Sequence, residues 1–317
     1  MFLVQRIIVG VKMPAERPWT ACQLNSASRQ AVHHAFQVAS GGRLTMILAS
    51  LLPEPESGWS RSHEEAELRL MQDRAAAEAV LNELRQQYAS AENSGKQIEC
   101  IVRSGDVWEE LIRIAGNRAD TLIVCGTRDS GSTPQGLFGG TGLKLLRFAS
   151  GPVWILKPPS DGNESTNNKS TEIVAATNLD SMGADVIRTA VSIASQSSSR
   201  LHIIHATQHE SDIENVKDLV YEQLAATDYR TIQAGVKVHV FVGDAQVSIL
   251  NAAREGNADL VILGTSSKIG VAGSLPGSTL ERVLPELTCS VLALKPEGFR
   301  SILPADFWTM QRTHATF

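Results

Sequence analysis

Cysteine is sparse in this chain of 317 residues, and its spacing carries no metal or disulfide pattern. The sequence contains no CxxC pair, so neither a zinc site nor a disulfide framework is expected. The four cysteines are Cys22, Cys100, Cys125 and Cys289. Cys125 falls within the apolar run TLIVCG, where we expect a buried, unreactive thiol.

Long hydrophobic runs are also lacking. No apolar run approaches the roughly 20 residues that a membrane-spanning helix needs. The N-terminal stretch MFLVQRIIVGVK is too short and too charged for a signal peptide, and it leads directly into a strand pattern. A net charge of -5 disfavours a broad nucleic-acid surface. We therefore expect a cytoplasmic globular protein that binds neither membranes nor nucleic acids.

The motifs of several enzyme classes are missing as well. The sequence has no P-loop, no GxGxxG after a strand and no GxSxG, so no motif supports a kinase, dehydrogenase or hydrolase function. His202 and His205 stand at odd spacing on one expected strand and point to opposite faces, which argues against a shared metal ion. We assign no catalytic residue and no metal ligand.

The chain does contain an internal repeat. Residues 158–170 hold no large apolar side chain and predict a linker between domains at 1–157 and 171–296, followed by a C-terminal tail at 297–317. Expected strands recur in the same order in both halves. They are 6–11 and 172–177, 44–49 and 201–206, 98–102 and 236–242, TLIVC and LVIL, and VWILK and VLALK.

Amphipathic helices separate these strands. One apolar face comprises Ala66, Leu70, Ala77, Leu81, Leu84 and Tyr88, and its counterpart comprises Ile213, Val216, Val220 and Leu224. Short apolar strands alternating with helices predict parallel sheets covered on both faces. The fold class is therefore α/β, with two doubly wound five-stranded domains in tandem.

Together these landmarks resemble the universal stress protein family in its tandem form, similar to the E-type members of enteric bacteria. The resemblance rests on the Gly-Asp turns at 105–106 and 243–244, the strand ADLVILG, the loop from Gly264 to Thr279, and the closing strands GPVWILKP and CSVLALKP. It implies an adenine nucleotide alpha hydrolase-like fold and a regulatory role in stress response. It also implies that VWILK and VLALK pair inside the chain as a pseudo-dimer, and a homodimer is a further expectation.

In this family, nucleotide-binding members carry G-x2-G-x9-G-[S/T] after the fourth strand and an Asp after the first. The second half nearly keeps this loop, with Ser267 replacing the second glycine and Asn178 replacing the Asp. The resemblance thus implies an ATP site, with or without Mg²⁺. Its residues are Ala176, Asn178, Leu263, Gly264, Ser267, Gly277, Ser278 and Thr279. Lys268 and Arg282 are candidates for the counter-charge.

A purely structural interpretation stands beside this one. Ser278-x-x-Glu281 is also a capping box, which stabilises a helix start without any ligand. Asp106 and Asp244 in the Gly-Asp turns are likewise expected to cap the helices that follow. The apolar tail is expected to pack on a domain or on a partner subunit.

The first half departs further from the nucleotide-binding pattern. Asp129 stands where the loop has its second glycine, the hydroxyl moves to Thr141, and Lys12 occupies the place of the Asp. A carboxylate beside a triphosphate is unfavourable unless a metal ion intervenes. We expect a non-binding or differently binding first domain. The competing function is an interaction scaffold that holds another small or apolar ligand, and ATP turnover is expected to be slow at most.

Overall fold

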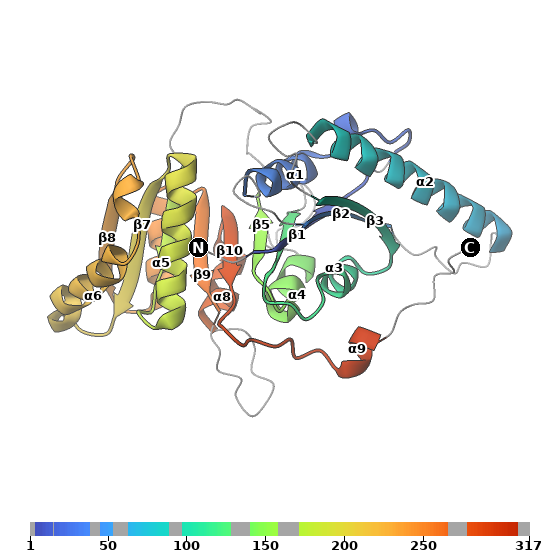
Figure 1. The fold of residues 1–317 in the computed structure, drawn as a ribbon. Helices are drawn as coiled ribbons and strands as arrows, with labels where there is room; N and C mark the ends of the chain where they lie inside the picture. Colours follow the sequence, from blue (N-terminus) through green and yellow to red (C-terminus); the bar gives the residue numbers. More distant parts are fainter. Residues whose placement is uncertain are drawn as a thin grey trace.

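The computed structural model describes residues 4–14, 16–38, 45–52, 63–88, 97–127, 140–157, 171–265 and 278–309. Its strands form one sheet with helices on both faces (Figure 1). The predicted linker, 158–170, lies outside the described residues.

The first domain alternates strands and helices along the chain. Its strands are β1 (Arg6–Val11), β2 (Thr45–Leu52), β3 (Gln97–Ser104), β4 (Thr121–Gly126) and β5 (Val153–Leu156). Its helices are α1 (Ser26–Val38), α2 (His63–Tyr88), α3 (Val107–Ala115) and α4 (Gly140–Phe148).

The second domain repeats this order with shorter connections. Its strands are β6 (Glu172–Ala176), β7 (Arg200–Thr207), β8 (Val236–Val242), β9 (Leu260–Gly264) and β10 (Ser290–Leu294). Its helices are α5 (Ser181–Ser197), α6 (Ile213–Ala225), α7 (Ala245–Glu255) and α8 (Ser278–Val283), and α9 (Ala305–Thr309) lies in the tail. The five predicted strands of each half are confirmed.

The two domains join edge to edge in a ten-stranded sheet of order β3-β2-β1-β4-β5-β10-β9-β6-β7-β8. Strands within each domain pair in parallel, whereas β5 and β10 pair antiparallel, with Trp154 opposite Leu292. The structure therefore contains the pseudo-dimer that the resemblance implied. Pairing also covers two strand edges that would otherwise expose unsatisfied backbone groups.

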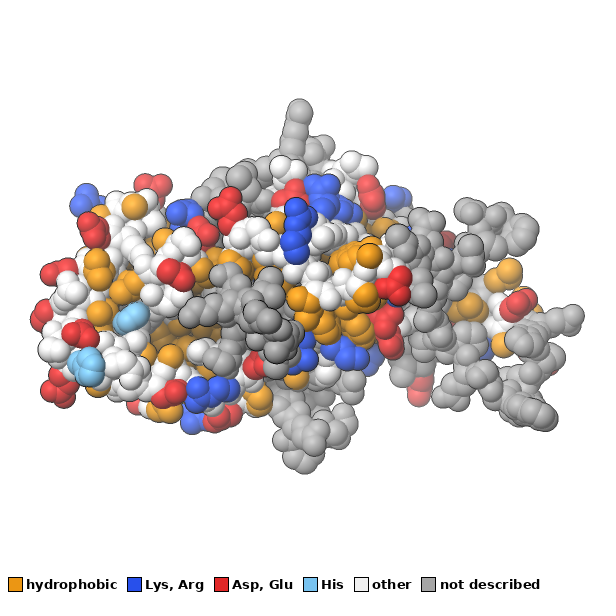
Figure 2. Space-filling view, turned by 90° about the horizontal axis from the view of Figure 1, so that it is seen from below, with side chains coloured by type: hydrophobic (Ala, Val, Ile, Leu, Met, Phe, Trp, Pro, Cys, Tyr) orange, Lys and Arg blue, Asp and Glu red, His pale blue; other side chains and the backbone are white. Residues whose placement is uncertain are grey.

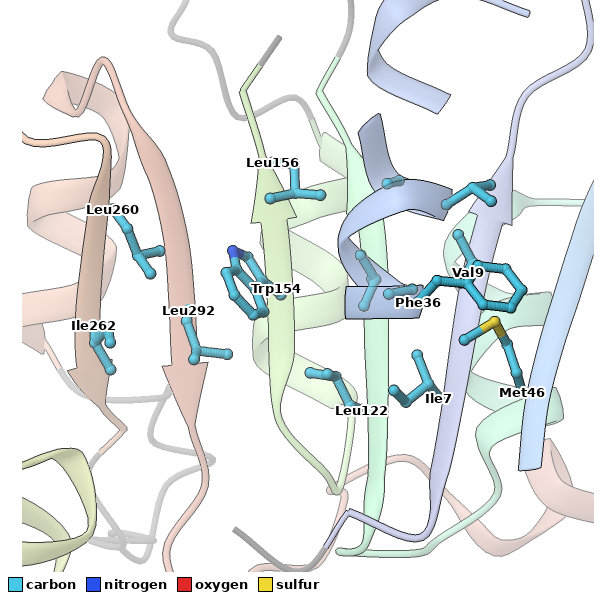
Figure 3. Close-up of a cluster of buried hydrophobic side chains, with 14 of the residues drawn as sticks. Ile7, Val9, Phe36, Met46, Leu122, Trp154, Leu156, Leu260, Ile262 and Leu292 are labelled. Carbon is cyan, nitrogen blue, oxygen red and sulfur yellow. The ribbon is translucent and has the colours of Figure 1, made fainter. Parts of the chain in front are cut away.

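Helices cover both faces of the sheet. On one face α1, α2, α5 and α6 bury a cluster that runs across the seam, where Trp154 lies beside Leu292 (Figure 3). The predicted helix faces are confirmed, since Ala77, Leu81 and Leu84 are buried on α2. Val216, Val220 and Leu224 are buried on α6. The opposite face is covered by α3, α4, α7 and α8.

The tail leaves the second domain and packs on the first, as Figure 1 shows for α9. Phe307 stacks on Trp108 with ring centroids 6.1 Å apart, and the Arg113 guanidinium lies 4.4 Å from the Phe307 ring. Figure 2 views the molecule from below, and hydrophobic side chains gather near the middle of the surface that it shows. The expectation that the tail packs on a domain is confirmed.

Lys295 forms a second contact across the seam. It follows β10, and its ammonium donates a hydrogen bond to the carbonyl of Leu146 in α4. The same Nζ lies 4.5 Å from the centroid of the Phe299 ring. Burial lowers the pKa of Lys295 to about 7. A salt bridge between Arg147 and Glu281, at 2.6 Å, also joins α4 to α8.

The two predicted aspartate caps differ. Asp244 accepts from the backbone N–H groups of Gln246 and Val247, so this prediction is confirmed. Asp106 stands at the N-cap position of α3 but makes no side-chain capping bond, so that prediction is wrong. The carboxylate of Glu109, in the first turn of α3, accepts from Arg113 one turn later, at 3.0 Å.

No described helix is long and apolar enough to cross a membrane. Among the same residues, no group of three or more His, Cys, Asp or Glu side chains could hold a metal ion.

Candidate functional site

The predicted site of the second domain lies at the carboxyl edge of the sheet, where β6 and β9 adjoin. Ala176 and Leu263 are in register at the ends of these two parallel strands. Asn178 and Gly264 follow them, so both emerge at the same edge. The chain continues from β6 to β7 on one side and arrives at β9 on the other, which makes this a topological switch point. Ligands of doubly wound sheets bind in such crevices.

A strained turn holds Asn178 at this edge. Leu179 has a φ of 66°, in the left-handed region that leucine rarely adopts. Its N–H donates to Thr177 Oγ1 at 3.1 Å, and its carbonyl accepts from Gln223 Nε2 at 3.0 Å. Such a conformation costs about 1–3 kcal/mol and persists only where its surroundings enforce it. The turn therefore presents Asn178, which is exposed, in a fixed position.

Asp180 stands beside Asn178 and is a residue that the sequence analysis did not consider. Asn178 Nδ2 donates to Asp180 Oδ2 at 2.8 Å, while Asp180 Oδ1 accepts from the N–H of Gly183 and caps α5. The Asn178 amide oxygen keeps its acceptor capacity. Carboxylate and amide oxygens together suit the donor groups of a ribose or a base, and they disfavour a phosphate at this point.

Gly264 has a packing role that the motif alone did not reveal. A Cβ at this position would lie 2.4 Å from Cγ of Met182, because the start of α5 crosses directly over the end of β9. Gly126 is in the same situation in the first domain, where a Cβ would lie 2.6 Å from Cβ of Ala27 in α1. Gly126 is therefore required by the approach of the α1 backbone whether or not a ligand binds, whereas at Gly264 the close atoms belong to a methionine side chain that can move.

Thr265 is a second candidate that the sequence analysis missed. Its residue is 1% exposed, and its Oγ1 has no hydrogen-bond partner among the described residues. A buried hydroxyl left without a partner costs about 1–3 kcal/mol. Thr265 directly follows Gly264, so this unsatisfied group marks the start of the predicted nucleotide loop. Its signal in the sequence was a hydroxyl residue after the strand-end glycine in both halves, Thr127 and Thr265.

The remaining predicted residues are only partly described. Ser267, Gly277 and Lys268 lie outside the described residues. Ser278 is the first residue of α8, and Thr279 follows it half-buried. Thus Ala176, Asn178, Leu263 and Gly264 are brought together at the edge.

The expected counter-charge and capping partner at α8 are occupied elsewhere. Arg282 donates to Asp244 Oδ2 at 3.2 Å, and Glu281 accepts from Arg147 at 2.6 Å. Arg282 is thereby tied to the N-cap of α7, and the Glu281 carboxylate faces the first domain. These tertiary ion pairs compete with the counter-charge role of Arg282 and the capping role of Glu281, and both roles stay predictions.

The first domain contains a cavity of about 300 Å³ at the equivalent switch point, between β1 and β4. It is lined by the ends of β1, β4 and β5 and by residues in the first turns of α1, α3 and α4. Cys125 lies in its wall, and burial raises the pKa of this thiol to about 12, as expected of an unreactive cysteine.

The histidines of β7 take separate partners. His202 hydrogen-bonds through Nε2 to Glu172 at 3.0 Å and through Nδ1 to His239 at 3.1 Å. His205 instead bonds through Nδ1 to the carbonyl of Thr177 at 2.9 Å. The predicted separation of His202 and His205 is confirmed, and burial together with His202 lowers the pKa of His239.

The sequence is similar to a family model and to known proteins. A family model described as the universal stress protein family matches residues 20–157 and 170–295. A universal stress protein of Mycolicibacterium smegmatis is 27% identical over 218 residues, which cover 65% of this chain and 71% of the relative. Universal stress protein E of Escherichia coli K12 is 24% identical over 239 residues, which cover 68% of this chain and 73% of the relative.

Solved structures show the same fold. A universal stress protein from Archaeoglobus fulgidus superposes with a TM-score of 0.61 at 18% identity, covering 95% of this chain and 98% of that one. A protein of Pseudomonas aeruginosa PAO1 has a TM-score of 0.57 at 22% identity, covering 92% and 93%. The family model matches two segments, each half has five strands, and the order of helices repeats. The chain therefore belongs to the universal stress protein family and carries two of its domains in tandem.

Proposed function

We propose that this protein is a regulatory stress-response protein that binds one adenine nucleotide, ATP, in its second domain. The observation that carries the proposal is the convergence of Asn178 and Gly264 at the switch point between β6 and β9. The loop that begins at Gly264 returns at Ser278, the first residue of α8. Its glycine and hydroxyl spacing follows the nucleotide-binding pattern of the family with one replacement, at Ser267.

The described groups suggest an orientation for the nucleotide. The exposed Asn178 amide and Asp180 carboxylate suit the ribose and base. The phosphates then point toward α8, whose first backbone N–H groups and positive dipole end favour an anion. Mg²⁺ bound to the phosphates would lower the repulsion from Asp180. A bound nucleotide would supply a partner for the buried Thr265 hydroxyl.

Calorimetric titration of the full chain with ATP, with and without Mg²⁺, tests the proposal. We expect saturable binding near one nucleotide per chain and negligible hydrolysis. Asn178→Ala removes one hydrogen-bonding group and is expected to weaken binding about threefold to tenfold. The matched control is Asn251→Ala, an exposed asparagine of α7, which is expected to leave the affinity unchanged. Absence of ATP binding under both conditions would refute the proposal.

The second candidate function is an interaction scaffold that carries a different small ligand. The cavity of the first domain favours it, because that cavity stands in the domain whose loop departs from the nucleotide pattern. Native mass spectrometry of the purified protein distinguishes the two by the mass of any bound molecule. The same spectrum measures whether the chain forms a homodimer, which stays a prediction.

A further inference from the structure

We infer that the cavity of the first domain is a second ligand site, selective for a small monoanion with an apolar body, such as a medium-chain carboxylate. The site is separate from the proposed nucleotide site, because it lies between β1 and β4 rather than between β6 and β9. Its volume of about 300 Å³ falls at the lower end of the range for small-molecule sites.

Small residues open this cavity, and larger ones replace them in the second domain. Gly10 and Cys125 pair in register at the ends of β1 and β4, where the second domain has Ala176 and Leu263. Gly142 in α4 corresponds to Leu280 in α8, which is 2% exposed and fills its surroundings. A Cβ on Gly142 would reach the tip of Ile155, 3.0 Å away. The first domain therefore carries smaller side chains than its repeat at these three positions.

The walls are mainly apolar, which calls for a ligand with an apolar body. Leu51, Leu111 and Ile155 contribute aliphatic surface, and the Cys125 thiol stays protonated because burial raises its pKa to about 12. Burying a polar or charged ligand body against such a surface would cost several kcal/mol, whereas a hydrocarbon body gains from leaving water.

Among the described residues, the polar groups at the cavity favour one negative charge. Lys12 is the only charged side chain among the described lining residues, and none of the ion pairs between described residues includes it. The first turns of α1 and α4 also face the cavity and direct their positive dipole ends toward it. A cationic ligand would be repelled by all three.

Two contacts prepare this arrangement. The N–H of Lys12 donates to Ser28 Oγ at 3.0 Å, which ties the end of β1 to α1 and sets Lys12 at the cavity mouth. Thr127 also lines the cavity; it is 7% exposed, and its Oγ1 has no hydrogen-bond partner among the described residues. This buried hydroxyl is available to an anionic head group, for which Lys12 supplies the charge.

The same groups fit an adenine nucleoside poorly. Where the second domain offers the Asn178 amide, the first offers Lys12, which donates hydrogen bonds and accepts none. The adenine amino group needs an acceptor at that edge. A monoanion with a hydrocarbon body makes no such demand.

Titration calorimetry with octanoate, on the full chain without nucleotide, tests the inference. We expect one octanoate bound per chain, and octylamine, with the same hydrocarbon length and the opposite charge, at least about tenfold weaker. Lys12→Gln is expected to weaken octanoate about fivefold, in the range for an exposed charge. The matched control Lys237→Gln, at an exposed position of β8, is expected to leave binding unchanged.

Gly142→Leu copies the second domain into the first and is expected to abolish octanoate binding while leaving ATP binding intact. If that variant does not fold, Cys125→Leu supplies the same test from the opposite wall. Three results would each overturn the inference: no saturable octanoate binding up to about 10 mM, equal affinity for octylamine, or loss of ATP rather than octanoate binding in a folded, cavity-filled variant. Because Asn178→Ala acts on ATP alone, failure of this inference is distinguishable from failure of the proposed function.

Discussion

Replacing Lys295 by methionine is expected to change how the stability of this protein depends on pH. Lys295 places its ammonium at the seam between the domains, hydrogen-bonded to the Leu146 carbonyl and over the Phe299 ring. Burial nevertheless lowers its pKa from 10.5 to about 7, since a charged amine loses its hydration there. Methionine keeps the length of the side chain without the titrating group.

The sign follows from the protons bound in each state. Between pH 7 and 10.5 the folded protein binds fewer protons at Lys295 than the unfolded chain, so the free energy of unfolding rises with pH. Each pH unit in this window contributes up to about 1.4 kcal/mol. From about pH 7 to about pH 9 the wild type should gain about 2 kcal/mol relative to Lys295→Met. Below about pH 6 both states are protonated and the difference levels off.

Urea denaturation of both proteins, followed by tryptophan fluorescence, measures this difference. The quantity to compare is the free energy of unfolding of the wild type minus that of Lys295→Met, at matched pH values from about 6 to about 9. Subtracting the variant cancels every other titrating group. A difference that stays constant over this range would refute the reasoning, because it would mean that Lys295 remains protonated in the folded protein.

Three further substitutions have defined outcomes. Gly126→Ala should destabilise the protein more than Gly264→Ala, because the new methyl meets the backbone of α1 in the first case and a movable methionine in the second. We expect losses in the free energy of unfolding of about 1–3 kcal/mol or more, measured by urea denaturation. Equal losses would contradict this. Phe307→Ala removes the aromatic and cation–π contacts of α9, worth about 1–2 kcal/mol. Limited proteolysis should therefore cut the tail of the variant faster than that of the wild type. An unchanged rate would argue that other contacts hold the tail. Asp244→Ala removes an acceptor from two backbone N–H groups and should lower the melting temperature. An unchanged melting temperature would show that water replaces the cap.

The repeat, the order of its elements and the family were readable from the sequence. Apolar residues recur with different periods in strands and in amphipathic helices. Val216, Val220 and Leu224 could therefore be placed on one buried helix face before any contact was known. The cap at Asp244 was likewise a local prediction, because its partners are two and three residues away. The same local prediction was wrong at Asp106, which makes no side-chain capping bond.

Only the tertiary structure decided which groups are free to act. The motif gave Gly264 a ligand role, but the fold shows that its missing side chain also makes room for the Met182 side chain of α5. Arg282 and Glu281 take ion-pair partners from distant segments, which no local pattern predicted. The sequence by itself determined two similar domains and a nucleotide-type loop in the second. The cavity in the first domain is lined by Gly10, Cys125 and Gly142, which come from three separate elements. No local sequence pattern predicts that these residues lie together.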